Sequence, residues 1–373
     1  MAPRCLSAAV MPALLAVANA QGQALLSTIA TVPELSSFSA VILASGGSEP
    51  NPAFEERFNS VLDRRNYTAL APTNEVSNYD SQSSKYMVVI KRFDPSKAID
   101  KIPPALVEAL TAAPAYPIFE SIIRTHVAEG FFTSADVVSA SPFEAIQGFP
   151  LAAAAVGGGQ VILVNNQAQI VAVDTFASNG IVHHIDQVLN PFTDYFGISN
   201  ATGPPTISDS DGTVADILLS DERLSTIRHI LQALSPDLIN IRLALAEAGG
   251  TPQIFAVPSN DAFADLPDST VDVSVAPSNQ VLSLQLYSFG LLNADARFAD
   301  LDFSSGPINV PSTLTGINVT ASQVDGGATF LNNAAIQEQV CGSNGCVWIV
   351  DRVLDPLYLA FGPLNRDLAF AGR

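Results

Sequence analysis

Each half of the chain contains an apolar run that ends at a proline, followed by a hydroxyl residue, an asparagine and an acid. The first copy is residues 67–75 (YTALAPTNE), and the second is residues 254–261 (IFAVPSND). Such a run predicts a buried strand that the proline ends. The acid suits the positive end of a helix dipole. The residues expected to cap the following helix are Thr73 or Asn74, and Ser259 or Asn260.

A second pattern closes each half, where an Asn-Gly dipeptide precedes an apolar run and a Val-Leu-x-Pro ending. It occupies residues 178–191 and 344–356. Asn-Gly is typical of a tight turn, and the apolar run predicts a strand. Residues 160–174 predict two more strands around a polar turn. Helical periodicity marks three further segments: 54–65, 224–234 and 238–248. Mixed helices and short strands predict an α+β fold in both halves.

Duplicated patterns at a domain-sized spacing predict two tandem domains. A chain of 373 residues is long enough for two cores. The residues between the halves are rich in Gly, Pro, Ser and Asp, which is typical of a linker. The predicted organisation is a signal peptide at 1–20, a first domain at 21–192, a linker at 193–210, a second domain at 211–360 and a tail at 361–373.

The first twenty residues have the features of a signal peptide. Arg4 supplies a positive start, residues 6–17 are an apolar run, and an Ala-Asn-Ala cleavage site ends at Ala20. We expect the mature chain to begin at Gln21 and to be secreted, either to the extracellular space or to the cell wall. No later segment has the ~18 apolar residues of a membrane span, so no transmembrane segment is predicted.

The charge of the chain narrows the choice of partners. The sequence has 17 basic and 36 acidic residues, and Arg4 is the one charged residue of the leader, so the mature net charge is 16 − 36 = −20. Such a chain repels nucleic acids and anionic lipid surfaces, so neither is expected as a partner. Hydrophobic residues make up 48% of the chain, which is enough to fill two cores and argues against general disorder.

The cysteines agree with export. Cys5 is lost with the leader, and Cys341 and Cys346 remain as a pair that can close a short disulfide loop. The alternative is half of a metal site, but the sequence offers no further Cys or nearby His to complete the four ligands that zinc needs.

Three N-glycosylation sequons occur in the chain, and export would make each of them available. Asn200 is the best candidate because it lies in the expected linker. Asn66 is less suited because it directly precedes an expected core strand. The third asparagine is Asn318.

The paired patterns resemble the fasciclin (FAS1) family, whose members carry a first box similar to FAPTNEAF and a last box similar to NGVIHVIDRVLLP. The first boxes here are residues 70–76 and 255–263, and the last boxes are residues 179–191 and 344–356. Each box alone is a weak signal. Both boxes occur in order in both halves, which makes the combined signal specific.

The resemblance covers roughly residues 33–192 and 211–357. It implies two tandem FAS1-like domains, each a β-wedge or sandwich flanked by helices. It also implies extracellular adhesion, with a partner in the matrix or the cell wall. It brings no cofactor and no catalytic residues.

The family's middle motif is a Tyr-His pair before a segment similar to VPGVYTSADL. In the first half Thr125 and His126 take these positions, so the histidine is kept. In the second half Tyr287 and Ser288 take them, so the tyrosine is kept. Neither half has the complete pair. His126 and Tyr287 are therefore candidates for partner binding or for a structural role.

Other polar residues have a structural interpretation beside the chemical one. His183 and His184 are neighbours on an expected strand and point to opposite faces, so they do not share a metal ion. Asp186 and Asp351 belong to separate domains, which favours a hydrogen bond or a salt bridge within each fold over a shared catalytic role. Residues 209–212 resemble the start of a calcium loop but lack its closing Glu, so we interpret them as linker.

Together these observations predict a secreted adhesion or binding protein rather than an enzyme, with no cofactor. The expected partner is a polysaccharide or glycoprotein of the cell wall or extracellular matrix, and two linked domains can gain avidity on a repetitive surface. One alternative is an enzyme acting on cell-wall polysaccharide, which would need carboxylates or a nucleophile gathered in one cleft. The other is a structural scaffold that assembles with itself.

Overall fold

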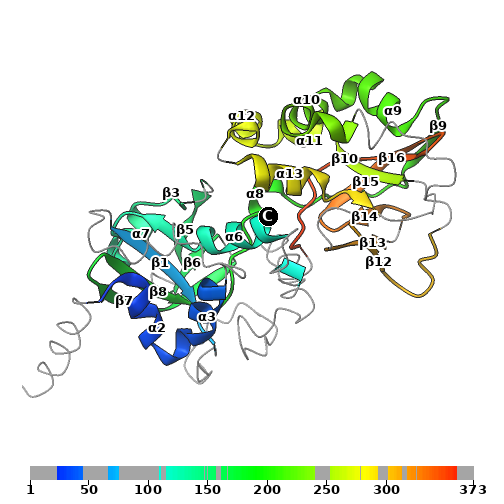
Figure 1. The fold of residues 1–373 in the computed structure, drawn as a ribbon. Helices are drawn as coiled ribbons and strands as arrows, with labels where there is room; N and C mark the ends of the chain where they lie inside the picture. Colours follow the sequence, from blue (N-terminus) through cyan, green and yellow to red (C-terminus); the bar gives the residue numbers. More distant parts are fainter. Residues whose placement is uncertain are drawn as a thin grey trace, which may run out of the picture. The chain divides into compact units, whose positions relative to one another are not determined.

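The chain forms two compact units, seen in a computed structural model (Figure 1). The first comprises Met1–Pro104, Glu120–Leu189 and Leu364–Arg373, and the second comprises Ala105–Phe119 and Asn190–Pro363. The structure describes residues 23–44, 66–74, 109–110, 115–146, 148, 150–156, 161–165, 167–239, 253–277, 279–292, 301–312, 317–324 and 326–358. The predicted helix at 54–65 and most of the one at 238–248 lie outside these residues.

The first half of the chain builds a mixed sheet and covers it with helices. The helices are α2 (Leu25–Thr31), η1 (Pro33–Leu35), α3 (Ser36–Ala44), α6 (Tyr116–Thr125) and α7 (Ser134–Ser139). The strands are β1 (Tyr67–Pro72), β2 (Val127–Glu129), β3 (Phe143–Glu144), β4 (Pro150–Leu151), β5 (Ala153–Val156), β6 (Val161–Val164), β7 (Ala168–Ala177) and β8 (Gly180–Ile185). The main sheet has the order β2-β1-β8-β7-β6-β5, and β3 pairs with β4. β1 and β8 are parallel, so the strands of the first and last sequence patterns lie side by side.

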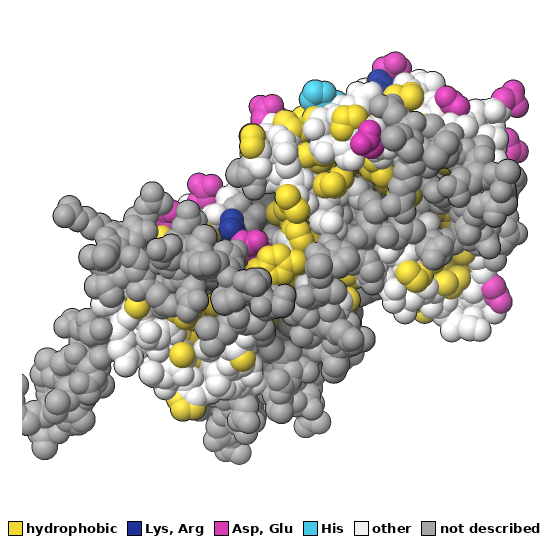
Figure 2. Space-filling model, in the orientation of Figure 1, with side chains coloured by type: hydrophobic (Ala, Val, Ile, Leu, Met, Phe, Trp, Pro, Cys, Tyr) yellow, Lys and Arg dark blue, Asp and Glu magenta, His cyan; other side chains and the backbone are white. Residues whose placement is uncertain are grey.

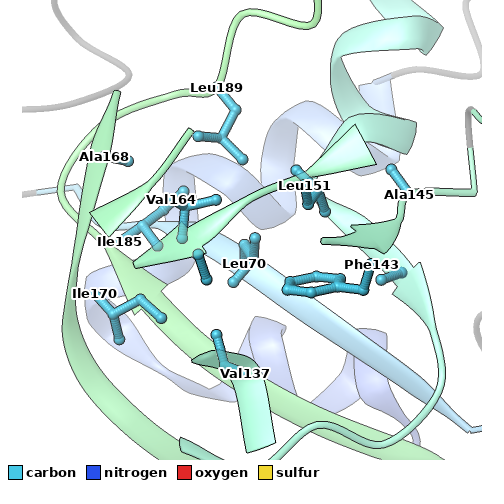
Figure 3. Packing of buried hydrophobic residues seen from close by; sticks show 12 residues of the cluster. Leu70, Val137, Phe143, Ala145, Leu151, Val164, Ala168, Ile170, Ile185 and Leu189 are labelled. Atoms are coloured by element: carbon cyan, nitrogen blue, oxygen red, sulfur yellow. The ribbon is translucent and has the colours of Figure 1, made fainter. Parts of the chain in front are cut away.

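The core explains why the first pattern is a continuous apolar run. β1 is buried along its whole length, as a central strand with both faces covered must be. Leu70 of this strand packs in one cluster with Val137 of α7, Phe143 of β3 and Ile185 of β8 (Figure 3). Full burial of each such side chain contributes about 1.5–3 kcal/mol of transfer free energy. The predicted buried strand is therefore confirmed.

The second half repeats this architecture, so the predicted α+β class holds for both halves. Its helices are α8 (Thr193–Phe196), α9 (Val214–Ser220), η2 (Glu222–Leu224), α10 (Ser225–Leu234), α11 (Asn260–Ala264), α12 (Thr270–Val275) and α13 (Gln280–Ser288). Its strands are β9 (Thr206–Asp209), β10 (Gln253–Pro258), β11 (Leu291–Leu292), β12 (Ile308–Pro311), β13 (Asn318–Gln323), β14 (Thr329–Leu331), β15 (Ala334–Gly342) and β16 (Gly345–Val350). The sheet order is β11-β10-β16-β15-β14-β13-β12, and β10 is parallel to β16. None of the helices in the described part of the chain is long and apolar enough to cross a membrane.

The asparagine after the first strand of the first half anchors the start of α3. The side-chain amide of Asn74 donates to the carbonyl oxygen of Pro33 at 2.9 Å and to the hydroxyl of Ser36 at 2.6 Å. Its oxygen accepts from the backbone N–H of Ser37 at 2.8 Å. One side chain thus satisfies groups at a helix start that the helix itself leaves open.

Asn260 makes the same three bonds in the second half. Its amide donates to the carbonyl oxygen of Glu222 at 2.9 Å and to Ser225 at 3.0 Å, and its oxygen accepts from Thr226 at 3.0 Å. The helix cap expected from the sequence is instead Ser259, whose hydroxyl accepts from the third residue of α11. The asparagine therefore serves a helix far away in the sequence.

The two Asn-Gly turns also have matching partners. Asn179 accepts a hydrogen bond of 2.7 Å from the backbone N–H of Leu25, the first residue of α2. Asn344 accepts one of 2.7 Å from Val214, the first residue of α9. The two halves therefore agree in single hydrogen bonds as well as in strand order.

The segment expected as a linker, residues 193–210, has regular structure within the second unit. It contains α8, and β9 pairs in parallel with β15. The backbone N–H of Ser199 donates to the carbonyl oxygen of Asn333 at 2.8 Å, and its hydroxyl donates to Asp351 at 2.5 Å. The polar composition of this segment does not predict a strand, because β9 is formed by pairing with β15, which is far away in the sequence. The predicted domain boundaries themselves stay a prediction.

Candidate functional site

His126, a candidate for partner binding, is fully buried in the turn between α6 and β2. Its Nδ1 lies 2.8 Å from the carbonyl oxygen of Ile122, and the backbone N–H of Leu189 donates to its Nε2 at 2.9 Å. The ring is therefore neutral, with its proton on Nδ1. Burial lowers the pKa of His126 from 6.5 to about 4. Both ring nitrogens serve the fold, which favours the structural role.

The strand register changes the residues assigned to the middle motif of the second half. The carbonyl oxygen of His126 accepts from the backbone N–H of Leu70 at 2.8 Å, and that of Gly290 accepts from Ala256 at 2.9 Å. Leu70 is the fourth residue of β1, which is parallel to β8, and Ala256 is the fourth residue of β10, which is parallel to β16. Because these positions are equivalent, Gly290 corresponds to His126. The predicted correspondence of Ser288 with His126 is wrong by two residues.

Tyr287 lies on α13 and is almost completely buried. Its hydroxyl shares a hydrogen bond of 2.7 Å with that of Ser274 on α12, and its ring centroid lies 5.9 Å from that of Phe263 on α11. Burial raises the pKa of Tyr287 to about 12. The side chain therefore packs three helices of the second unit together, which again favours a structural role.

Each of the two aspartates that follow a closing strand accepts a hydrogen bond from the backbone of the preceding strand. Asp186 accepts a hydrogen bond of 2.7 Å from the backbone N–H of Gln169 at the start of β7. Asp351 accepts one of 2.8 Å from Ala335 at the start of β15. The predicted hydrogen bonds within each fold are confirmed, and they occupy the carboxylates that a catalytic role would need.

The adjacent histidines of β8 differ in exposure, as their alternation predicts. His183 is fully buried, whereas His184 is half-buried. Burial holds the pKa of each below 6.5. Within the described ranges, no group of three or more His, Cys, Asp or Glu residues is placed to hold a metal ion.

A serine, an aspartate and a histidine meet on this part of the sheet, but their hydrogen bonds do not make a catalytic triad. Ser134 donates through its hydroxyl to Asp174 at 2.5 Å, and the backbone N–H of Asp174 donates to Nδ1 of His183 at 3.3 Å. Nε2 of His183 lies 2.7 Å from the carbonyl oxygen of Phe132 and donates its proton there. In a triad the histidine would accept the serine proton, and here both nitrogens are already used. These groups instead hold residues 130–134 across the sheet.

Thr68 of β1 fixes the other end of this segment. Its hydroxyl donates to the carbonyl oxygen of Gly130 at 3.0 Å and accepts from the backbone N–H of Phe132 at 2.9 Å. Gly130 has a φ of 120°, and an added Cβ would meet the Phe132 ring at 2.9 Å, so a larger residue would be strained. Phe132 packs inward, 4.9 Å from Phe143 between ring centroids, while Phe131 is left at the surface.

Phe131 and Phe176 form a ring pair that we call the aromatic surface. Their centroids are 5.9 Å apart and their planes 20° from parallel, with Phe131 39% exposed. Phe176 comes from β7 and is half-buried. An exposed aromatic ring on an anchored segment is a candidate contact surface. The sequence did not reveal it, because nothing in the Phe131-Phe132 dipeptide shows which ring faces outward.

The other exposed large apolar side chains among the described residues are aliphatic: Val156, Val173, Ile207, Leu219, Val273 and Val281. Figure 2 shows more acidic than basic side chains on the described part of the face in view, in keeping with the net charge of −19 for the whole chain.

The remaining predicted sites are placed as follows. Cys341 and Cys346 form the expected disulfide at the end of the β15–β16 hairpin. The three sequon asparagines, Asn66, Asn200 and Asn318, are all exposed. The exposure of Asn66 removes the objection that it precedes a core strand.

Residues 93–191 match the model of the Fasciclin domain. The chain is 29% identical over 149 residues to protein sll1483 of Synechocystis sp., covering 40% of this chain and 76% of that protein. It is 33% identical over 92 residues to the uncharacterized protein sll1735 of the same organism, covering 25% of this chain and 65% of that protein, which is less than two thirds of its length. A solved FAS1 domain pair from the insect cell adhesion molecule fasciclin I aligns with 86% of this chain and 96% of its own at 17% identity, with a TM-score of 0.31.

The matched region lies in the first half and ends with the last box at 179–191, so this similarity to the Fasciclin domain is confined to residues 93–191. The second half shares its parallel central strands and its asparagine hydrogen bonds. The chain thus contains a region similar to the fasciclin domain, at residues 93–191, and a second half with the same parallel central strands.

Proposed function

We propose that this protein is an extracellular, non-enzymatic binding protein that attaches to a neutral polysaccharide of a cell wall or matrix. The contact is made by the aromatic surface of Phe131 and Phe176. The proposal is supported by the similarity to the fasciclin domain and by the predicted signal peptide at residues 1–20. The observation that carries it is the exposed ring pair on an anchored segment.

The chemistry of the surface suits a sugar. The C–H faces of a pyranose ring are apolar and pack on an exposed aromatic face, which offers a large contact area. Thr68 and His183 hold the segment that carries Phe131 before any ligand arrives, so little ordering cost remains at binding. The mature net charge of −20 repels polyanions at low ionic strength, which favours a neutral polymer over an acidic one.

Turnover is not expected, because the groups with catalytic potential have other partners. Both nitrogens of His126 and of His183 are engaged within the fold. Asp186 and Asp351 each accept a backbone hydrogen bond. A single sugar contact is weak, so useful attachment to a wall depends on many contacts along a repetitive polymer.

A depletion assay with insoluble polymers tests this proposal. The full chain is mixed with cellulose, chitin, a neutral β-glucan and pectin, and both the bound fraction and the soluble reducing ends are measured. We expect saturable binding to a neutral polymer without release of sugar. Release that a single carboxylate substitution abolishes would show a polysaccharide-active enzyme instead. Failure to bind any polymer, with light scattering that grows with concentration, would favour the self-assembling scaffold.

A further inference from the structure

We infer that Asn66 carries an N-glycan whose first sugars pack on the aromatic surface and limit access of the polysaccharide to it. The inference rests on the proposed function, because glycan attachment requires export. It assigns the aromatic surface a ligand within the same molecule, and it makes glycosylation a regulator of binding.

Asn66 lies directly beside the segment that carries Phe131. It is exposed immediately before β1, and its carbonyl oxygen accepts a hydrogen bond of 2.8 Å from the backbone N–H of Gly130. Phe131 is the next residue after Gly130. The sequon and the exposed ring are therefore joined through adjacent backbone.

The side chain of Asn66 shares a face of the sheet with the aromatic surface. Asn66 immediately precedes β1, and continuing the alternation of the strand by one residue places Asn66 on the face of Thr68. Thr68 pairs with Ile181 of β8, and Ile181 pairs with Phe176 of β7, so these three side chains project to the same side. Phe176 is two strand spacings, roughly 10 Å, across the sheet from β1. Phe131, stacked on Phe176, covers this same face, within reach of the core sugars of a glycan on Asn66.

The fold accepts a glycan at this position without loss of packing. Thr68, the hydroxyl residue of the sequon, is buried and holds Gly130 and Phe132 in the folded protein. The sugar must therefore be attached before the domain folds. The exposed Asn66 side chain then leaves the glycan outside the core, next to an apolar ring that gains from being covered.

A tethered sugar competes well with a free polymer. Attachment beside the surface gives the glycan a high effective concentration, so weak packing is enough to occupy the rings for much of the time. Removal of the glycan should consequently raise the affinity for a polymer. The other two sequons, at Asn200 and Asn318, supply internal controls.

The first test needs no polymer. The full chain is secreted from yeast, and peptide mass spectrometry measures occupancy at each sequon and the rate at which endoglycosidase H releases each glycan from the native protein. We expect Asn66 to be occupied, with release about fivefold slower than at Asn318. In Phe131→Ala the two rates should become equal. An unoccupied Asn66 in secreted protein, or equal rates with Phe131 present, would overturn the inference.

The second test compares polymer binding by Asn66→Gln and by the control Asn318→Gln. Asn66→Gln should bind the retained polymer about fivefold more tightly, and Asn318→Gln should bind as the unaltered glycoprotein does. If the Asn66 glycan is released slowly but Asn66→Gln binds the polymer no more tightly, the claim that glycosylation regulates binding would be overturned. A chain that stays inside the cells, or that binds no polymer in any form, contradicts the proposed function rather than the packing of the glycan.

Discussion

The backbone N–H of Leu189 donates a hydrogen bond of 2.9 Å to Nε2 of His126, a residue 63 positions earlier in the chain. This bond ties the last box of the first domain to the turn before β2. It exists only while Nε2 is unprotonated, because a proton there would place two donors against each other. The pKa of about 4 in the folded protein reflects this burial, whereas the unfolded chain regains a value near 6.5.

The first prediction concerns pH. Between pH 6.5 and about 4 the unfolded chain binds a proton at His126 that the folded chain does not, so the unfolding free energy falls as the pH is lowered. Each pKa unit is worth about 1.4 kcal/mol, so the loss from His126 approaches roughly 3 kcal/mol near pH 4. Urea unfolding at pH 7 and pH 4.5 measures it.

A His126→Gln variant isolates this contribution. It should be less stable at pH 7 by about 2–4 kcal/mol, and it should lose less than the unaltered protein on acidification. The exposed His229 provides the control, since His229→Gln should leave both values unchanged. Parallel loss of stability in the unaltered protein and in His126→Gln would show that His126 is not the group responsible.

The second prediction concerns the asparagine of the first box. Asn260→Asp keeps the acceptor for Thr226 but removes the donor to the carbonyl oxygen of Glu222. A carboxylate would then face that oxygen, and we expect a loss of about 2–3 kcal/mol in unfolding free energy. Asn279→Asp is the control, because Asn279 donates a single partly exposed bond to Val273 and should cost under about 1 kcal/mol. Equal costs in the two variants would contradict the anchoring role.

The third prediction concerns the segment behind the aromatic surface. In protein made without glycosylation, Thr68→Val keeps the shape of the side chain and removes both hydrogen bonds to residues 130 and 132. We expect a loss of about 1–3 kcal/mol and faster hydrogen exchange at the amide of Phe132. Thr68→Ser keeps the hydroxyl and should retain most of the protection. Unchanged exchange in Thr68→Val would show that Thr68 does not hold the segment.

The fourth prediction concerns the disulfide. Cys341 and Cys346 are five positions apart, and closing so short a loop should contribute about 2 kcal/mol. A Cys341→Ala, Cys346→Ala double variant should be less stable by that amount, and a reducing agent should then have no further effect on it. Alkylation and intact mass of the unaltered protein, before and after reduction, establish the bond. Two thiols that react in denatured, unreduced protein would contradict it.

Local sequence patterns were sufficient to predict the elements that short runs of neighbouring residues determine. The run ending at Pro72 is a buried strand because every residue in it meets other parts of the core. The Asn-Gly dipeptides at 179–180 and 344–345 lie in the turns between the last two strands of each domain. The disulfide followed from a close pair of cysteines in a chain expected to be exported, with no further ligands nearby to complete a zinc site.

Features that depend on residues far apart in the sequence could not be predicted from local patterns. Ser259 or Asn260 was expected to cap the following helix. Ser259 does so, whereas the partners of Asn260 lie more than thirty positions earlier. Tyr287 and Ser288 were matched to the motif by residue identity, whereas strand register places Gly290, and not Ser288, at the position of His126. The turn before β11 is one residue longer than the turn before β2, and no local pattern marks that difference. The aromatic surface likewise depends on the pairing of β7 with β8.

The most direct measurement of the proposed binding is the affinity of Phe131 variants for the polymer that retains the full chain, measured on protein made without glycosylation. Phe131→Ala should weaken binding about tenfold, and Phe131→Leu, which keeps apolar area without a flat ring, should weaken it nearly as much. Val281→Ala, an exposed apolar change in the second unit, should bind as the unaltered protein does. Thermal unfolding confirms that each variant is folded. Full affinity in folded Phe131→Ala would contradict the account.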